Sequence, residues 1–97
     1  MENELVAYIK GKEGTLVDVR TIAEFQQAHL PSAIHIPLNE VPKRLEEIAS
    51  FTKPIILYCH SGYRSEIAAD YLQQQSVTEV INGGGIYQLM QLFETFT

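Results

Sequence analysis

The sequence predicts an α/β domain whose central sheet is mainly parallel and carries helices on both faces. Short apolar segments typical of strands alternate with longer segments whose apolar residues recur at helical spacing. The segment at residues 55–58 is apolar throughout, as expected for a central parallel strand that is buried on both faces. The length of 97 residues suits one hydrophobic core. We therefore expect a single domain over residues 1–97, with a radius of gyration of about 12–13 Å.

The first half of the chain is expected to contain three helices and two strands. Leu5, Tyr8 and Ile9 fall on one helical face. Pro42 is compatible with the first turn of a helix, because that position needs no backbone N–H. The predicted elements are a helix at residues 4–9, a strand at 15–19, a helix at 22–28, a strand at 33–36 and a helix at 39–50.

The second half is expected to alternate in the same way. A strand is predicted at residues 55–58, a helix at 65–75, a short strand at 80–81 and a closing helix at 86–96. Gly83-Gly84-Gly85 is predicted to be a turn. It lacks both the Lys-Ser/Thr pair of a phosphate-binding loop and the full spacing of a dinucleotide fingerprint.

The composition excludes several classes of partner. The chain has 12 acidic and 7 basic residues, and its formal net charge is −5. The basic residues are scattered, with no stripe that could follow a phosphate backbone. No apolar run approaches the roughly 20 residues that cross a bilayer, and the acidic start is not followed by an apolar stretch of secretory type. We expect a cytoplasmic protein that binds neither nucleic acid nor membrane.

Cys59 is the only cysteine, which excludes an intramolecular disulfide and a structural zinc cluster. The three histidines do not have the spacing of a metal site, so neither a metal nor another cofactor is predicted. A lone cysteine is most often a small buried hydrophobe. The residues that follow Cys59 change this interpretation.

Cys59 ends the most apolar predicted strand and precedes a strong helix, at the edge of a parallel sheet where ligands bind. Loop amides and a helix N-terminus favour an anionic sulfur at this place. Arg64 adds a cation, and Gly62 can adopt a positive φ that curls the loop around the side chain. These features lower the pKa of a thiol below its free value of about 8.5. We therefore interpret Cys59 as a reactive cysteine held by a loop of His60, Ser61, Gly62, Tyr63, Arg64 and Ser65.

Four motifs, in order and at the right spacing, together resemble the rhodanese family of single-domain sulfurtransferases. They are Leu16-Val17-Asp18-Val19-Arg20 with Glu24-Phe25, residues 28–37, residues 55–65, and Asn82-Gly83-Gly84-Gly85-Ile86. The resemblance spans nearly the whole chain, although Ala28 and Ser32 stand where the family usually has glycines. It implies a rhodanese-like three-layer domain, with a mostly parallel central sheet of about five strands and helices on both faces.

The resemblance also implies a sulfurtransferase of the thiosulfate:cyanide type. The Cys59 thiolate would take the outer sulfur of a donor such as thiosulfate and pass it, as a persulfide, to cyanide, a thiol or a protein acceptor. Loop amides from His60 to Ser65 would hold the charge of the persulfide, and Arg64 would help to hold the anionic donor. With no second cysteine, the acceptor must be external. The expected partners are small sulfur-containing anions or thiols, together with a protein sulfur acceptor.

Four charged residues are expected to lie near this loop. We predict that Asp18, Arg20, Glu24 and Arg64 form an ion-pair network that braces the loop. The alternatives are a solvated surface cluster, worth about 0–1 kcal/mol, and direct participation in catalysis.

The other loop side chains have predicted roles outside the chemical step. His60 is expected to contribute its amide rather than its imidazole, and Ser61 and Tyr63 are expected to shape the rim of the site. Ser65 is expected to cap the following helix, which is compatible with a hydrogen bond to the persulfide.

Two other functions stay open. Cysteine phosphatases and arsenate reductases of related architecture place five residues between cysteine and arginine, whereas four separate Cys59 from Arg64. The shorter loop fits a sulfur atom better than a phosphate. The second alternative is a binding or regulatory module that carries sulfur without turnover.

Overall fold

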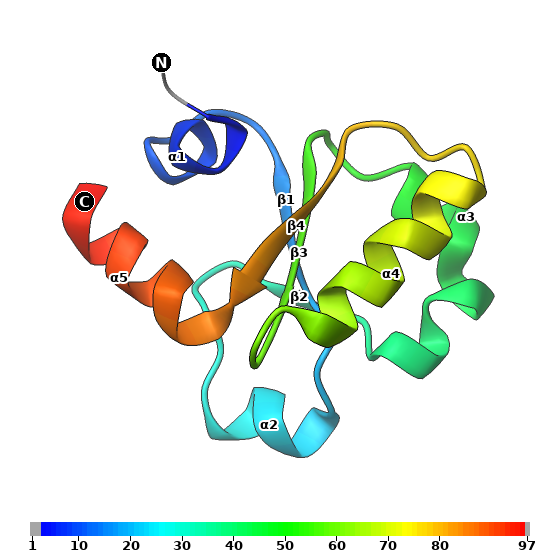
Figure 1. The fold of residues 1–97 in the computed structure, drawn as a ribbon, viewed down its shortest axis with the longest axis horizontal. Helices are drawn as coiled ribbons and strands as arrows, with labels where there is room; N and C mark the ends of the chain where they lie inside the picture. Colours follow the sequence, from blue (N-terminus) through cyan, green and yellow to red (C-terminus); the bar gives the residue numbers. More distant parts are fainter. Residues whose placement is uncertain (1–2, 97) are drawn as a thin grey trace.

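A computed structural model describes residues 3–96, which form a four-stranded parallel sheet flanked by helices (Figure 1). The strands are β1 (Thr15–Asp18), β2 (Ile34–His35), β3 (Ile55–Cys59) and β4 (Val80–Gly85). They lie in the order β2-β1-β3-β4, and every neighbouring pair is parallel. The predicted α/β class with a parallel central sheet is confirmed.

Helices cover both faces of the sheet and one of its ends. They are α1 (Glu4–Ile9), α2 (Ile22–Gln27), α3 (Leu45–Ala49), α4 (Tyr63–Gln74) and α5 (Ile86–Phe96), and the 3₁₀ helices η1 (Leu38–Glu40) and η2 (Pro42–Arg44) precede α3. α1 and α5 lie on one side of the sheet, α3 and α4 lie on the other, and α2 lies beyond the carboxyl ends of the strands (Figure 1). The radius of gyration is 12.3 Å, within the expected range.

The two faces of β3 bury different side chains, because successive residues of a strand point to opposite faces. Ile55, Leu57 and Cys59 belong to the core cluster that includes residues of α3 and α4. Ile56 and Tyr58 belong to the cluster on the side of α1 and α5. All five residues are fully buried, as predicted for a central strand. The side chain of Cys59 therefore points to the face that α4 covers.

The expectation of about five strands is wrong for residues 3–96, which contain four. The segment before β1 forms α1, the helix that the sequence predicted at residues 4–9, and the Asn3 side chain caps this helix by accepting a hydrogen bond from the Val6 amide at 2.8 Å. α1 packs against α5, where the Tyr8 ring lies edge-on to Phe93 with 6.5 Å between ring centroids. The segment therefore covers a face of the sheet and does not extend it.

Residues 39–50 do not form the continuous helix that was predicted. Two 3₁₀ turns take up the first part of this segment, and the α-helix begins only at Leu45. Pro42 is the first residue of η2 and has no backbone N–H with which to continue a helix from η1. The apolar side of the segment still faces the core, because Val41 and Ile48 are both buried.

Gly83-Gly84-Gly85 belongs to β4 and is not the predicted turn. Leu57 pairs with Asn82 while the next residue, Tyr58, pairs with Gly84, so β4 has one extra residue at this point. This is a β-bulge, and Gly84 adopts a φ of 88° there. The bulge keeps β4 paired with β3 as far as Cys59, which brings β4 next to the Cys59 loop.

Candidate active site

The loop around Cys59 is short and tightly folded. Cys59 is the last residue of β3, and Gly62 is the N-cap of α4, so only His60 and Ser61 lie between them. Gly62 has a φ of 96°, the positive value that the sequence suggested. This conformation lets the Gly62 amide donate a hydrogen bond to the Cys59 sulfur at 3.0 Å. The loop therefore curls around its own first side chain.

Hydrogen-bond donors converge on the sulfur. Burial raises the pKa of the Cys59 thiol, but the Ser65 hydroxyl and the amides of Ser65, Gly62 and Ser61 lower it by a larger amount together. Hydrogen bonds to a thiolate favour the charged form over the neutral thiol. The pKa of Cys59 is consequently below its ordinary value, which favours the nucleophilic thiolate.

Arg64 lies in the first turn of α4, which begins at Tyr63, two residues earlier than predicted. Its guanidinium group donates two hydrogen bonds to the Glu24 carboxylate of α2, at 2.7 and 2.9 Å. The hydrogen bond from Arg64 is the main reason that the pKa of Glu24 falls to about 2. Glu24 also completes a capping box with Thr21 at the start of α2. One carboxylate therefore joins the start of α2 to the start of α4.

Asp18 and Arg20 form a second ion pair at the end of β1, with 2.7 Å between Arg20 Nη2 and Asp18 Oδ2. Both side chains are buried. The Arg20 Nη2 also donates to the carbonyl of Ala28, the C-cap of α2, at 2.6 Å. The four charged residues of the predicted network thus form two ion pairs, one that holds α4 to α2 and one that holds α2 to β1.

The rim of the site carries large exposed side chains. Tyr63, Tyr87 and Ile22 are 71%, 63% and 55% exposed, and they lie at the starts of the helices that begin at this edge of the sheet. The His60 ring is edge-on to Tyr87, with 5.8 Å between ring centroids. Cys59 itself has no exposed surface.

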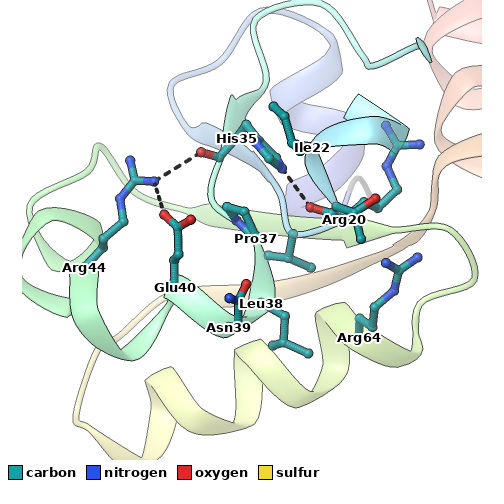
Figure 2. Close-up of a pocket in the computed structure, with 11 residues that line it drawn as sticks. Arg20, Ile22, His35, Pro37, Leu38, Asn39, Glu40, Arg44 and Arg64 are labelled. Carbon is teal, nitrogen blue, oxygen red and sulfur yellow. Dashed lines mark hydrogen bonds and ion pairs between the residues drawn. The ribbon is translucent and has the colours of Figure 1, made fainter. Parts of the chain in front are cut away.

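A hollow of about 740 Å³ lies beside the loop (Figure 2). Arg64 lines it on the side of the Cys59 loop, whereas Cys59 does not line it. Arg20 and Arg44 also line the hollow, and all three arginines pair with carboxylates of neighbouring residues. The hollow therefore offers hydrogen-bonding surface whose positive charge is already balanced.

His29 and His35 both stack on the ring of Phe25, with centroid distances of 3.8 and 4.6 Å. His35 Nε2 lies 2.7 Å from the Arg20 carbonyl oxygen, and these histidines hold the β1–α2–β2 segment together. Residues 3–96 contain no group of three His, Cys, Asp or Glu side chains placed to hold a metal ion. In the same part of the chain, every helix is too short or too polar to span a membrane.

Two polar side chains near the site were not predicted from the sequence. The Tyr58 hydroxyl accepts a hydrogen bond from the Leu30 amide at 3.1 Å, although Tyr58 was interpreted only as an apolar strand residue. The Asn82 side chain donates to the Gly62 carbonyl at 3.1 Å. Its position just before the glycines of β4 is the only signal in the sequence, and this signal does not identify its partner.

A model of the rhodanese-like domain family matches residues 1–90, and the chain belongs to this family. It is 34% identical over 84 residues to thiosulfate sulfurtransferase GlpE of Vibrio cholerae, covering 84% of this chain and 78% of that protein. It is 43% identical over 72 residues to a sulfurtransferase of Allochromatium vinosum, covering 73% of this chain and 66% of that protein. The resemblance to rhodaneses is confirmed.

Another relative differs in length and in name. The chain is 46% identical over 67 residues to Bacillus subtilis YrkF, whose name describes a sulfur carrier protein. This match covers 69% of the chain but only 36% of YrkF. The family relatives therefore include proteins named as sulfurtransferases and one named as a sulfur carrier.

Solved structures place the fold in the same family. A rhodanese from Escherichia coli aligns with a TM-score of 0.70 and 32% identity, covering 77% of this chain and 89% of that chain. A rhodanese-related protein from Thermoplasma volcanium aligns with a TM-score of 0.73 and 26% identity, covering 89% and 87%. The rhodanese fold predicted from the four motifs is confirmed, with four strands in the part that the structure describes.

Proposed function

We propose that this protein transfers sulfane sulfur from a donor such as thiosulfate to an external acceptor, through a persulfide on Cys59. The observation that carries the proposal is the set of hydrogen-bond donors around the Cys59 sulfur, which lowers the pKa of its thiol. A thiolate with preorganised amides around it suits nucleophilic attack on sulfur. Relatives named as thiosulfate sulfurtransferases support the same donor class.

The proposed first step loads the cysteine. The Cys59 thiolate attacks the outer sulfur of thiosulfate, and a new S–S bond forms to that atom. The bond between the two sulfur atoms of thiosulfate breaks, and sulfite leaves with the electron pair. Amides of Ser61, Gly62 and Ser65 then stabilise the negative charge on the outer sulfur of the persulfide.

The proposed second step returns the free cysteine. A nucleophile such as cyanide attacks the outer sulfur of the persulfide, thiocyanate leaves, and the electron pair of the broken S–S bond restores the Cys59 thiolate. The acceptor is external, because the chain has no second cysteine. Small thiols and protein thiols present the same type of nucleophile as cyanide. Two such half-reactions predict ping-pong kinetics.

Mass spectrometry after treatment with thiosulfate tests the loading step. We expect the wild-type protein to gain one sulfur atom and the Cys59→Ser variant to gain none, with both proteins folded by circular dichroism. Addition of cyanide should remove the sulfur and produce thiocyanate. A wild-type protein that gains no sulfur from thiosulfate or from a small-molecule persulfide would overturn the proposal.

The same experiment distinguishes the carrier alternative, which the name of YrkF favours. A carrier would accept sulfur on Cys59 but would not release it to cyanide in repeated turnovers. Aryl-phosphate hydrolysis, assayed in parallel, tests the phosphatase alternative. Turnover of the aryl phosphate without sulfur loading would support the phosphatase in place of the sulfurtransferase.

A further inference from the structure

The Ser65 hydroxyl is buried beside Cys59 and has more acceptors in reach than it can serve. Its oxygen lies 2.7 Å from Asn82 Oδ1, 3.2 Å from the Gly62 carbonyl oxygen and 3.5 Å from the Cys59 sulfur. A hydroxyl group has a single hydrogen to donate. Donation to one of these acceptors therefore competes with donation to the sulfur.

The geometry around Asn82 decides which acceptor has the advantage. The Gly84 amide can only donate, and it lies 3.0 Å from Asn82 Oδ1. The Gly62 carbonyl can only accept, and it lies 3.1 Å from Asn82 Nδ2. These two backbone groups fix the orientation of the side-chain amide. Asn82 Oδ1 must therefore accept the hydrogen of Ser65 at their 2.7 Å contact.

The β-bulge explains why Asn82 reaches this position. The register of β4 changes directly after Asn82, so the Gly84 amide turns back toward the Asn82 side chain. The Asn82 side chain then spans from the bulge to the N-cap of α4. Asn82, a residue of the neighbouring strand, thus contacts both Gly62 and Ser65, the two residues that hydrogen-bond to the Cys59 sulfur.

We propose that Asn82 is a positioning residue that competes with Cys59 for the single hydroxyl hydrogen of Ser65. Asn82 does not touch the sulfur and acts on it through Ser65. In the resting thiol, Ser65 donates to Asn82. When the sulfur becomes a thiolate, it is a stronger acceptor, because hydrogen bonds to charged groups are stronger than those to neutral groups. The thiolate then competes with Asn82 for the Ser65 hydrogen. The inference rests on the proposed role of Cys59 as the nucleophile.

This competition affects the reactivity of the thiolate. A thiolate that keeps a strong donor has a lower pKa but is also a weaker nucleophile. Because Asn82 competes for the Ser65 hydrogen, the hydrogen bond from Ser65 to the thiolate is weaker, and the sulfur stays more nucleophilic. Other charged or titratable groups near Cys59 are Arg64 of α4 with Glu24 of α2, Asp18 of β1 with Arg20, and His60 of the loop. Substitution of Asn82 or Ser65 by alanine changes none of these charges.

The test measures the pKa of Cys59 in the wild type, Asn82→Ala, Ser65→Ala and the double variant. The pKa is taken from thiolate absorbance and from the midpoint of the pH profile of the alkylation rate. The midpoint depends on the fraction of thiolate, whereas access of the alkylating reagent to the sulfur changes only the maximum rate. We expect Asn82→Ala to lower the pKa of Cys59 by about half a unit to one unit, because Ser65 is then free to donate to sulfur. Ser65→Ala should raise it. In the Ser65→Ala background, the Asn82 substitution should leave it unchanged.

Two further variants exclude a general effect of loosening β4. Gln73→Ala removes another side-chain amide that joins α4 to β4, at the Val80 carbonyl, and it should leave the pKa of Cys59 unchanged. Asn82→Asp keeps an accepting oxygen toward Ser65 and adds a negative charge, so it should raise the pKa of Cys59. Opposite shifts for the alanine and aspartate variants do not arise from partial unfolding.

The proposal is overturned if Asn82→Ala leaves the pKa of Cys59 unchanged, or lowers it equally with and without Ser65. A shift in Gln73→Ala of the same size as in Asn82→Ala would also overturn it. Alkylation and absorbance require no sulfur donor, so these outcomes leave the proposed sulfur transfer intact. Conversely, failure of the wild type to load sulfur refutes the proposed function whatever the alkylation profiles show.

Discussion

The Cys59 loop and the β1–α2 junction (residues 18–24, from the end of β1 to the start of α2) meet at the same edge of the sheet but are held by different kinds of interaction. The loop surrounds the sulfur with neutral donors, namely backbone amides and one hydroxyl. The junction is held by charged groups, with a buried Asp18–Arg20 pair and with Glu24, whose partner Arg64 lies in α4. Neutral donors can stabilise charge that develops on sulfur without adding a fixed charge of their own.

The difference indicates a division of roles between the two regions. Arg64 is paired with Glu24 at 2.7 Å, so its positive charge is balanced before an anionic donor arrives. We infer that the amides of the loop act on the sulfur, while the ion pairs stabilise the fold by joining β1, α2 and α4. The predictions that follow test this division, because variants of the junction should affect stability and variants of the loop should affect sulfur transfer.

The largest effect is expected from Asp18→Asn. This variant removes the charge partner of the buried Arg20, and the loss of one partner of a buried ion pair costs about 3–5 kcal/mol. Urea unfolding should show a loss of about this size, whereas sulfur loading per folded molecule should stay near the wild-type value. Glu40→Gln is the control, because it removes an exposed pair with Arg44 worth less than about 1 kcal/mol. Equal stability of Asp18→Asn and the wild type would contradict the bracing role.

A smaller but more specific effect is expected from Gly85→Ala. A Cβ atom at this position would lie 2.6 Å from the His60 carbonyl oxygen, so the backbone of the Cys59 loop would have to shift. Misplacement of reacting groups by about 1 Å can cost on the order of 100-fold in rate. We expect single-turnover sulfur loading to slow by roughly tenfold or more.

Gly83→Ala is the matched control in the same strand. Its Cβ atom would lie 2.9 Å from the Ile56 side chain, which belongs to the core and not to the loop. Both glycine variants should lose about 1–3 kcal/mol of stability from overpacking, and only Gly85→Ala should slow loading. Equal loss of loading in the two variants would mean that β4 supports the loop only through its general stability.

A still smaller effect on stability is expected from loss of the Arg64–Glu24 pair, and this effect should depend on pH. Arg64 lowers the pKa of Glu24 from its ordinary value of 4.5 to about 2. The contribution of this carboxylate to folding is therefore complete above about 4.5 and is lost as the pH falls through about 2. Because both side chains are 31% exposed, we expect it to be worth about 1 kcal/mol or less at neutral pH.

Glu24→Gln removes the titrating group. Unfolding of the wild type and of this variant, measured from neutral pH down to about 2, should give a stability difference that shrinks as the carboxylate becomes protonated. Arg64→Lys should behave like a weakened pair, because lysine cannot form the paired hydrogen bonds of a guanidinium group. A difference that stays constant over the whole pH range would show that the charge of Glu24 is not what stabilises the fold.

The sequence was sufficient for features that neighbouring residues determine. The four apolar residues of β3 predicted a buried central strand, because a strand covered on both faces has no alternation. The order of Cys59, Gly62 and the following helix predicted a curled loop, because only local φ angles are required to form it. These parts of the site can be predicted without knowing which segments pack against them.

Features that depend on register between distant segments could not be predicted in this way. The contacts of Asn82 depend on the bulge opposite Leu57, and no residue pattern within β4 alone specifies where that bulge lies. The predicted helix at 39–50 was wrong because Pro42 was placed in the first turn of one long helix, whereas it begins a separate 3₁₀ turn. The fifth strand came from the family resemblance and not from an apolar segment of this chain.

The smallest effect is expected from the side chain of His60, which belongs to the Cys59 loop but has no role in the division described above. Its ring packs edge-on against Tyr87, on the exposed side of the loop. His60→Gln keeps the backbone amide, so we expect steady-state sulfur transfer to change by less than about threefold, whereas loss of a general base would cost about 100-fold or more. Tyr87→Phe keeps the aromatic contact and serves as the control for rim packing. A large loss in His60→Gln but not in Tyr87→Phe would place a titrating side chain among the neutral donors of the loop, and the contrast between loop and junction would then no longer hold.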